Sequence, residues 1–334
     1  MVIVSSYTLA VIFCIITMLC WGSWANTQKL ASQSWRFQLF YWDYTLGVLL
    51  MALLFAFTMG SKGSQGRAFM MDLAQASSGS LIAAFIGGII FNIANLLLVA
   101  AIDIAGMSVA FPVGIGIALD WGVVINYIAT PVGNPVWLFV GVGLVVVAIV
   151  LDAIAYKKLP SPSGNVSTRG IVISVVAGIA MGFFYRFVAA SMALNFSNPE
   201  PGKLTPYTAV VIFSLGIFLS NFLWNSIFMY KPLKGEPVTY SDYFRLGNPA
   251  LHGIGLLGGV IWCVGMTFSI LSSEQAGFAI SYGLGQGATM IAAAWGVFIW
   301  KEFKESPKGT NGLIAFMFLL FIFGLSLIII SRLN

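Results

Sequence analysis

Charged side chains are scarce in this chain. Asp, Glu, Lys and Arg together make up 8% of its 334 residues, whereas a soluble domain carries about 25%. Apolar residues make up 59% of the chain, and the mean hydropathy is +0.94. So few charges cannot cover a folded chain of this size for water, which excludes a soluble domain. Lipid must surround most of the surface.

Cysteine and histidine are scarce as well. Cys14, Cys20 and Cys263 all lie inside apolar runs, and an odd set of buried cysteines is not a disulfide framework. His252 is the single histidine, and no carboxylates cluster at ligand spacing. We therefore expect neither a metal site nor a cofactor.

Long apolar runs dominate the sequence instead. A helix needs about 20 apolar residues to cross the hydrocarbon core of a membrane. Ten runs meet this length, and no small-residue cleavage pattern follows the first, so we interpret it as a retained helix. They predict an all-α integral membrane protein with ten transmembrane helices, at roughly 4–28, 37–59, 80–101, 106–128, 135–156, 170–194, 207–230, 250–272, 276–299 and 312–331.

One stretch occurs twice. Residues Ile86 to Gly122 align without a gap with residues Leu257 to Ala293, which are 171 positions further along the chain. Few residues are identical, but glycines, an acid and aromatics keep register. Two such hairpins half a chain apart are typical of a transporter with two repeats around a central site. The matches are Gly87-Gly88 with Gly258-Gly259, Phe91 with Trp262, Asp103 with Glu274, Ala105-Gly106 with Ala276-Gly277, Phe111 with Tyr282, and Gly114 and Gly116 with Gly285 and Gly287.

A Pro-, Ser- and Gly-rich connector near mid-chain divides the ten helices equally. We predict a first five-helix repeat at 1–157, a linker at 158–169 and a second five-helix repeat at 170–334. Because each repeat has an odd number of helices, the second inserts upside down. The architecture is then two inverted repeats around a central cavity.

The net charge of +5 would suggest nucleic acid as the partner of a soluble protein. Here the basic residues sit in short connectors, so we expect the bilayer, not nucleic acid, to be the partner. Connectors after odd-numbered helices hold eleven Lys and Arg residues, and the opposite side holds four. The positive-inside rule then predicts both termini outside the cytoplasm.

Charged residues at membrane depth are the first functional candidates, because each costs free energy unless it is paired or hydrated. Asp120 lies within the fourth helix, and Arg186 in the sixth is its natural partner. The pair either fixes helix packing, or Asp120 carries a proton with Arg186 as counter-charge or substrate anchor. Asp43 is the second proton-coupling candidate, and alternatively an interfacial acid in an aromatic belt. Asp103 and Glu274, in tight hairpin turns, are interpreted as structural.

Neutral polar and aromatic side chains outline a candidate substrate site. Amides offer paired donors and acceptors, and Trp and Tyr offer flat surfaces for stacking. Such a set suits a small, neutral, planar or polyhydroxy solute; alternatively, the amides only bond neighbouring helices. The candidate substrate-binding residues are Trp21, Trp24, Asn26, Asn92, Asn95, Tyr185, Arg186, Tyr282, Gln286 and Thr289.

Several short motifs resemble one known family. They are Cys20-Trp21-Gly22-Ser23-Trp24, Trp42-Asp43-Tyr44-Thr45, Gln275-Ala276-Gly277-Phe278-Ala279, and Trp295-Gly296-Val297 with Glu302-Phe303. Together, in this order and over nearly the whole chain, they resemble the ureide permeases. That family belongs to the drug/metabolite transporter superfamily, alongside bacterial sugar porters.

The resemblance implies ten helices in two inverted repeats, and a cavity lined mainly by helices 1, 3, 4, 6, 8 and 9. It also implies proton-coupled import, since plant members resemble importers of allantoin, uracil and related ureides. The short linker departs from the long cytoplasmic loop of the plant members. Termini outside the cytoplasm also differ from the usual superfamily arrangement.

The functional expectation is a secondary active transporter, not an enzyme, in a bacterial inner membrane. We expect a proton symporter that imports a ureide or nucleobase-like metabolite. The alternatives are a porter for a monosaccharide such as glucose, ribose or rhamnose, and a drug or metabolite exporter. A channel would need a continuous polar pore face, and an intramembrane enzyme would need paired catalytic groups at depth. The sequence shows neither feature and predicts no oligomeric state.

Overall fold

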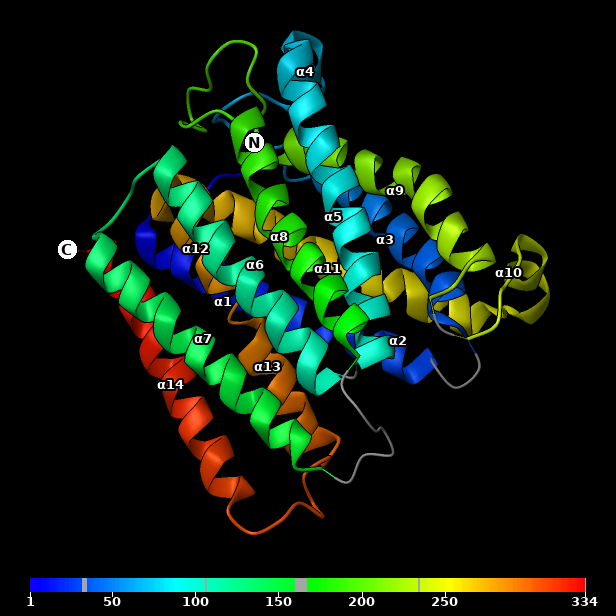
Figure 1. Ribbon diagram of the computed structural model, residues 1–334. Helices are drawn as coiled ribbons and strands as arrows, with labels where there is room; N and C mark the ends of the chain where they lie inside the picture. The colour runs from blue at the N-terminus through cyan, green and yellow to red at the C-terminus, as the bar shows by residue number, and fades with distance from the viewer. Residues whose placement is uncertain (32–34, 106, 160–166, 234, 334) are drawn as a thin grey trace.

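The computed structural model describes residues 1–31, 35–105, 107–159, 167–233 and 235–333. Within these ranges the chain is helical and has no strand, only an isolated bridge between Met192 and Leu204. The helices form one bundle (Figure 1). The predicted all-α fold is therefore confirmed.

Nine helical segments of the described chain are long and apolar enough to cross a membrane. Each begins and ends within a few residues of a predicted run, because the length of an apolar run sets the length of a spanning helix. They are α1 (Tyr7–Ser23) continued by α2 (Ala25–Ala31), α3 (Phe37–Phe57), α5 (Ser78–Ala105), α6 (Met107–Ala129), α7 (Pro135–Lys157), α8 (Thr168–Ser191), α9 (Pro206–Tyr230), α11 (Pro249–Ala276) and α14 (Thr310–Ile330).

The predicted helix at 276–299 is not one continuous helix. It consists of α12 (Phe278–Gly285), α13 (Ala288–Ala294) and the π-helix η1 (Trp295–Ile299), with Gln286 and Gly287 between the first two. At the start of α1, the Tyr7 hydroxyl donates to the Ile329 carbonyl near the end of α14 at 2.6 Å. Both chain ends therefore lie at the same end of the bundle, which favours a tenth crossing by this broken segment. The ten-helix count itself stays a prediction.

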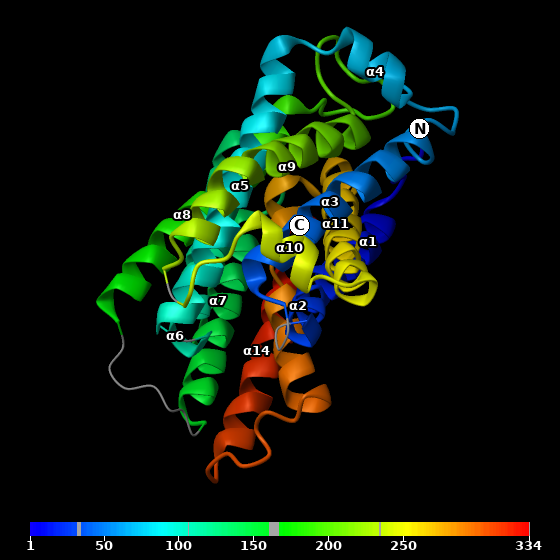
Figure 2. The same cartoon turned by 90° about the vertical axis from the view of Figure 1, so that its right-hand side faces the viewer.

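Two short helices that the apolar runs did not predict lie in the connectors. They are α4 (Phe69–Gln75) and α10 (Tyr240–Leu246). Thr239 and Asp242 form a capping box at the start of α10, in which each side chain accepts from the backbone N–H of the other residue. Figure 2 shows α4 far from the lower ends of α7 and α14.

Close helix crossings repeat in the two halves. In one, a Cβ on Gly88 of α5 would lie 2.1 Å from the Phe213 carbonyl oxygen of α9. In the other, a Cβ on Gly259 of α11 would lie 2.0 Å from the Tyr44 carbonyl oxygen of α3. Small residues of this kind let backbones approach in lipid. Gly88 and Gly259 are matched in the internal repeat, so equivalent positions make equivalent crossings.

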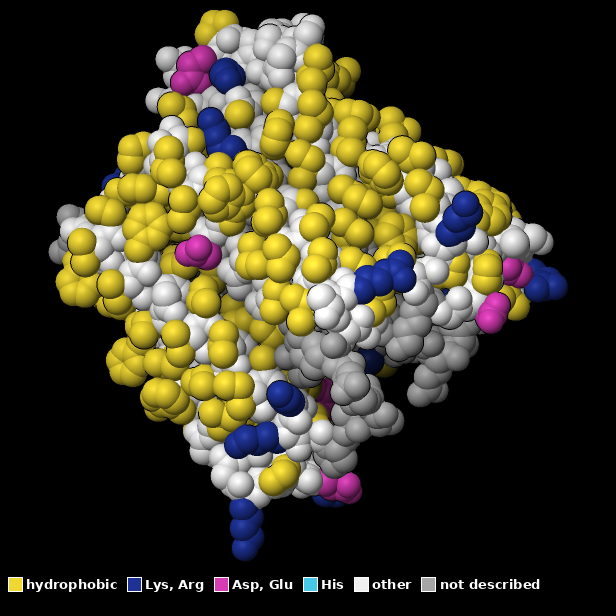
Figure 3. Space-filling model, viewed as in Figure 1, with side chains coloured by type: hydrophobic (Ala, Val, Ile, Leu, Met, Phe, Trp, Pro, Cys, Tyr) yellow, Lys and Arg dark blue, Asp and Glu magenta, His cyan; other side chains and the backbone are white. Residues whose placement is uncertain are grey.

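The surface agrees with a lipid environment. Figure 3 shows that hydrophobic side chains cover most of the face in view, while charged side chains are few. Large apolar side chains on spanning helices, such as Leu54, Phe222 and Ile322, are more than half exposed. With the spanning helices, this surface makes the chain an integral, multi-pass membrane protein.

Candidate functional site

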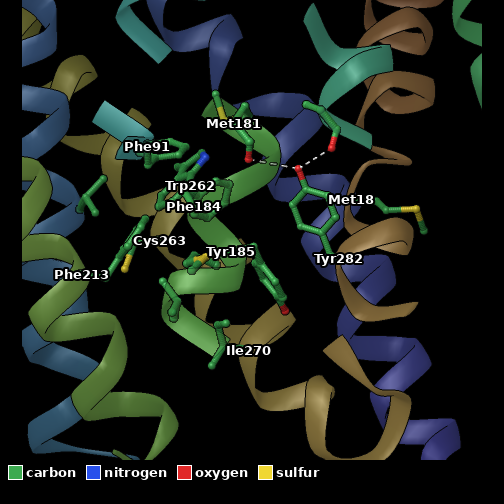
Figure 4. Packing of buried hydrophobic residues seen from close by; sticks show 14 of the residues in the cluster. Met18, Phe91, Met181, Phe184, Tyr185, Phe213, Trp262, Cys263, Ile270 and Tyr282 are labelled. Carbon is green, nitrogen blue, oxygen red and sulfur yellow. Dashed lines mark hydrogen bonds between the residues drawn. The ribbon is translucent and has the colours of Figure 1, made fainter. Parts of the chain in front are cut away.

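Aromatic side chains from both halves meet at the centre of the bundle (Figure 4). Phe91 of α5 and Trp262 of α11 are equivalent positions of the repeat, and their ring centroids lie 4.4 Å apart. Trp21 of α1 stacks on Trp262 with 5.9 Å between centroids and 13° between planes. Phe184 lies 5.1 Å from Phe91 by the same measure. We call Trp21, Phe91, Phe184, Phe213, Trp262 and Tyr282 the central aromatic cluster.

Tyr282 of this cluster and the neighbouring Tyr185 are fully buried, and their hydroxyls bond between helices. The Tyr185 hydroxyl shares hydrogen bonds with Ser269 Oγ at 3.1 Å and Ser281 Oγ at 2.9 Å. The Tyr282 hydroxyl donates to the Ala118 carbonyl at 3.1 Å. The predicted site residues Tyr185 and Tyr282 therefore lie together, where α6, α8, α11 and α12 meet.

Gln286 and Thr289 lie at the break between α12 and α13. Gln286 is 8% exposed and Thr289 is 4% exposed. The Gln286 carbonyl accepts both the Thr289 hydroxyl at 3.0 Å and the Thr289 backbone N–H at 3.2 Å. An amide placed at an irregular point of a spanning helix is a feature that transporters use to bind solutes.

The two predicted asparagines of α5 point to different helices. Asn92 donates to the Ile217 carbonyl at 3.2 Å and to Ser220 Oγ at 2.9 Å, both on α9. Asn95 donates to the Tyr41 hydroxyl of α3 at 3.2 Å. Asn92 therefore bonds neighbouring helices, the alternative considered above. Asn95 extends toward a group of aromatic residues on α3.

That group includes two residues that the sequence analysis did not select. Tyr41 and Tyr44 are completely buried, with ring centroids 5.2 Å apart. Trp24 lies 4.8 Å from Tyr44. The Tyr44 hydroxyl is buried without a hydrogen-bond partner in the described structure, and such a group is costly unless something bonds to it. The aromatic run Tyr41-Trp42-Asp43-Tyr44 could have indicated these two tyrosines, but only Asp43 was chosen from it as a candidate.

The remaining predicted residues of α1 and α2 bond across to the second half. Trp21 Nε1 donates to the Trp262 carbonyl at 3.2 Å. Asn26 Oδ1 accepts from Trp300 Nε1 at 2.6 Å, and its amide nitrogen donates to the Ser23 carbonyl. Asn26 is therefore committed to a contact between the halves in this conformation.

The expected pair of Asp120 and Arg186 does not form. The salt bridges among the described residues do not include it, and Asp120 is exposed on α6. The face of α6 that meets α8 is the one with Ala118 and Gly122, against which Gly182 packs. Residues at spacing four share a helix face and a residue two positions away does not, so Asp120 points elsewhere.

Asp43 makes the contacts that Asp120 lacks. Its carboxylate is 2% exposed and lies 2.9 Å from Nδ1 of His252 at the start of α11. The Tyr243 hydroxyl of α10 donates to the same carboxylate. Burial, and then the hydrogen bond to Asp43, raise the pKa of the Tyr243 phenol, so it remains a neutral donor. We call Asp43, Tyr243 and His252 the Asp43 cluster.

The acid in the second hairpin turn has a structural contact. Glu274 Oε1 accepts the backbone N–H of Phe196 at 2.7 Å, which ties the end of α11 to the loop after α8. This agrees with the structural interpretation of Glu274. The side chain of Asp103 and residue Gly106 in the first hairpin turn lie outside the described residues.

Buried aromatic and amide side chains at the centre of a multi-pass bundle are features of a membrane carrier. The ureide permease family model matches residues 40–161 and 162–331. The chain therefore belongs to the ureide permease family and is a membrane transporter.

Individual relatives agree along nearly the full length. Ureide permease 1 of Arabidopsis thaliana is 24% identical over 95% of both chains, and ureide permease 4 of the same plant is 24% identical over 99% of both. A putative sugar uptake protein of Enterococcus faecalis is 21% identical over 90% of this chain and 92% of its own. A crystal structure with a TM-score of 0.60 and 13% identity covers 97% of this chain and 96% of that one, which supports the fold alone.

Proposed function

We propose that this transporter imports a small, neutral, polar metabolite of the ureide or nucleobase class. Family membership supports the class of solute. The observation that carries the proposal is the buried aromatic centre with two polar groups beside it. They are the Tyr44 hydroxyl, which has no hydrogen-bond partner in the described structure, and the Gln286 amide, which lies beside the Tyr282 hydroxyl. Flat aromatic faces and paired hydrogen-bonding groups suit a planar amide-containing solute.

A monosaccharide is the second candidate. The relative named as a putative sugar uptake protein supports it, because that match covers most of both chains. Aromatic faces also stack on sugars, so the residues at the centre do not separate the two classes by themselves. Drug or metabolite export has no comparable support.

Thermal unfolding of the purified protein distinguishes the two candidates. A ligand that binds only the folded state stabilises it by about 2.7 kcal/mol at a hundredfold excess over Kd. We expect allantoin or uracil to raise the melting temperature and glucose, ribose and rhamnose to leave it unchanged. A shift with a sugar alone would replace the ureide proposal with the sugar proposal.

We further propose that uptake is coupled to protons through Asp43. Its carboxylate is buried beside an imidazole and a phenol, and histidine is the side chain whose charge most readily changes near neutral pH. Protonation of the carboxylate removes a buried charge and changes its contacts with α10 and α11 together. Such a change links a proton to a movement of helices. The salt bridges among the described residues include none to Asp120.

Proteoliposomes test this assignment. Asp43→Asn is expected to exchange labelled uracil with internal uracil but not to accumulate it when a proton gradient is imposed. Asp120→Asn, the matched control, is expected to accumulate uracil like the unchanged protein. Gradient-driven accumulation by Asp43→Asn would remove Asp43 from coupling, and its loss in Asp120→Asn alone would assign coupling to Asp120.

We propose the two inverted repeats, 1–157 and 170–334 joined by 158–169, as the framework for alternating access in an inner membrane. The repeated glycine crossings support it, and the two segments matched by the family model meet within the proposed linker. The charge distribution supports termini outside the cytoplasm. A cysteine added after Asn334 is expected to react with an impermeant thiol reagent on intact cells, and labelling only after lysis would reverse the orientation.

A further inference from the structure

Three side-chain pairs join the end of α1 and α2 to the segment from Trp295 to Glu302, which begins with η1. Each pair links a residue of the first half to one of the second. The indole N–H groups donate in two pairs, and the third pair is ionic. These pairs, which we call the zipper, are Ser23 with Trp295 at 2.8 Å, Asn26 with Trp300 at 2.6 Å and Lys29 with Glu302 at 2.5 Å.

The zipper has a regular geometry on its first side. Ser23, Asn26 and Lys29 are three residues apart, a spacing that places side chains along one face of a helix. The Lys29 ammonium also lies 4.3 Å from the centroid of the Trp300 ring, which adds a cation–π contact between neighbouring pairs. The pairs therefore form a continuous line from within the bundle to its edge.

An unusual backbone presents the second side. Lys301 has φ +52°, a left-handed conformation that non-glycine residues adopt at a cost. This turn brings Glu302 back over Gly296, whose carbonyl accepts the Glu302 N–H at 3.0 Å. Tyr156 of α7 then donates to the other carboxylate oxygen of Glu302 at 2.8 Å. Three elements thus hold Glu302 opposite Lys29.

The segment that carries the second side follows a break in the backbone and contains irregular helix. It is separated from α12 by the break at Gln286 and Gly287, and it ends in the π-helix Trp295–Ile299. Such π segments are frequent at functional sites. The outer pair is accessible to solvent, with Lys29 44% and Glu302 28% exposed, and exposed ion pairs contribute little stability. The outer pair can therefore open at small cost.

The geometry points to a gate. On the basis of the proposed transport function, we propose that the zipper closes the path between the central aromatic cluster and the end of the molecule that carries the basic connectors. Trp21 and Trp24 flank Ser23 on α1, so the innermost pair lies directly beside the candidate solute site. Opening requires the segment from Trp295 to Glu302 to separate from the end of α1 and from α2, and the closed zipper prevents solute release toward this end.

Among the described residues, the second half shows no equivalent line of pairs. Gly182 of α8 takes the place of Gly22 of α1, so Phe183 and Arg186 take those of Ser23 and Asn26. Phe183 instead packs edge-on against Trp121 of α6, with 5.7 Å between centroids. The zipper is therefore a property of one end, which a general packing role for this helix pair does not explain.

Thiol labelling tests the gate without any solute. In a full-length chain freed of its three cysteines, a single reporter, Thr289→Cys, lies on α13 behind the zipper. We expect Glu302→Gln to raise its labelling rate in nanodiscs about two- to fivefold, the change expected from losing one exposed ion pair. Trp300→Phe, which removes the indole hydrogen bond to Asn26 and weakens the ring contact with Lys29, is expected to raise the rate about fivefold.

A second reporter separates gating from general loosening. Ser214→Cys is fully buried on α9, away from the zipper, and its labelling rate is expected to stay constant in both variants. Unchanged rates at Thr289→Cys, or equal increases at both reporters, would overturn the gate. Because labelling needs no solute, a working gate combined with no ureide uptake would count against the proposed function and not against the zipper.

Discussion

Helix α6 and the segment formed by α12, α13 and η1 are matched positions of the internal repeat, yet they differ in continuity. Helix α6 runs unbroken from Met107 to Ala129, although it contains Pro112 and the pair Gly114 and Gly116. The matched segment is divided into α12, α13 and η1, and it breaks at the pair Gly285 and Gly287. Glycine spacing alone therefore does not break a spanning helix.

The surroundings of the two glycine pairs explain the difference. A Cβ at Gly116 would meet no atom within 4 Å, whereas one at Gly287 would lie 2.3 Å from the Met18 sulfur. The residue between the pair is Ile115 in α6 and Gln286 in the ninth helix. One hairpin thus keeps a regular helix, and the other presents an amide at an irregular point beside α1. The two copies of the repeat therefore share a fold but differ in the local structure that they present to α1.

The largest expected effect concerns the positions where the two hairpins are alike. Gly88→Ala and Gly259→Ala both place a Cβ about 2 Å from a carbonyl oxygen of the facing helix. Overpacking against backbone costs about 1–3 kcal/mol, or more when the backbone cannot yield. We expect both variants to lose most folded protein, measured by size-exclusion chromatography and thermal unfolding in detergent.

Each variant has a control on the same helix. Gly79 of α5 and Gly253 of α11 have no atom within 4 Å of an added Cβ, so Gly79→Ala and Gly253→Ala are expected to fold normally. A large loss for Gly88→Ala with none for Gly259→Ala would mean that the two crossings are not equivalent. It would break the comparison at its base.

The sequence predicts the spanning segments well because one physical quantity, the length of an apolar run, determines them. The break near Gln286 leaves that length unchanged, so hydropathy does not reveal it. Partners that lie far apart in the chain are harder still. Asp43 was a candidate, but its contacts with Tyr243 and His252 join residues about 200 positions away. Hydropathy placed Asp120 within a span correctly, and only the packing of α6 on α8 fixed the direction of its side chain.

The next prediction concerns the residue between the two glycines of each pair, which is Gln286 in one copy and Ile115 in the other. Gln286→Ala is expected to weaken ligand binding by about 1–3 kcal/mol, because a buried amide bond to the solute is lost. Ile115→Ala, at the matched position of α6, is expected to leave affinity unchanged. Isothermal titration with the ligand found by thermal shift measures both. Equal affinities for Gln286→Ala and the unchanged protein would mean that the break between α12 and α13 is not part of the binding site.

The smallest expected effect has opposite signs in the two helices. Gly116→Ala restricts the unfolded chain and meets open space, so we expect a gain of about 0.4–1 kcal/mol in the free energy of unfolding. Gly287→Ala must displace Met18 and Leu325, and a Cβ there would also lie 3.0 Å from the Leu284 carbonyl oxygen. Because Met18 is flexible and can partly yield, we expect a loss of only about 1 kcal/mol. Melting temperatures of the two variants, measured side by side in one detergent, give the signs directly. A gain in the free energy of unfolding at both positions would mean that Gly287 is required for movement and not for packing. The segment of α12 and α13 would then differ from α6 in its dynamics alone.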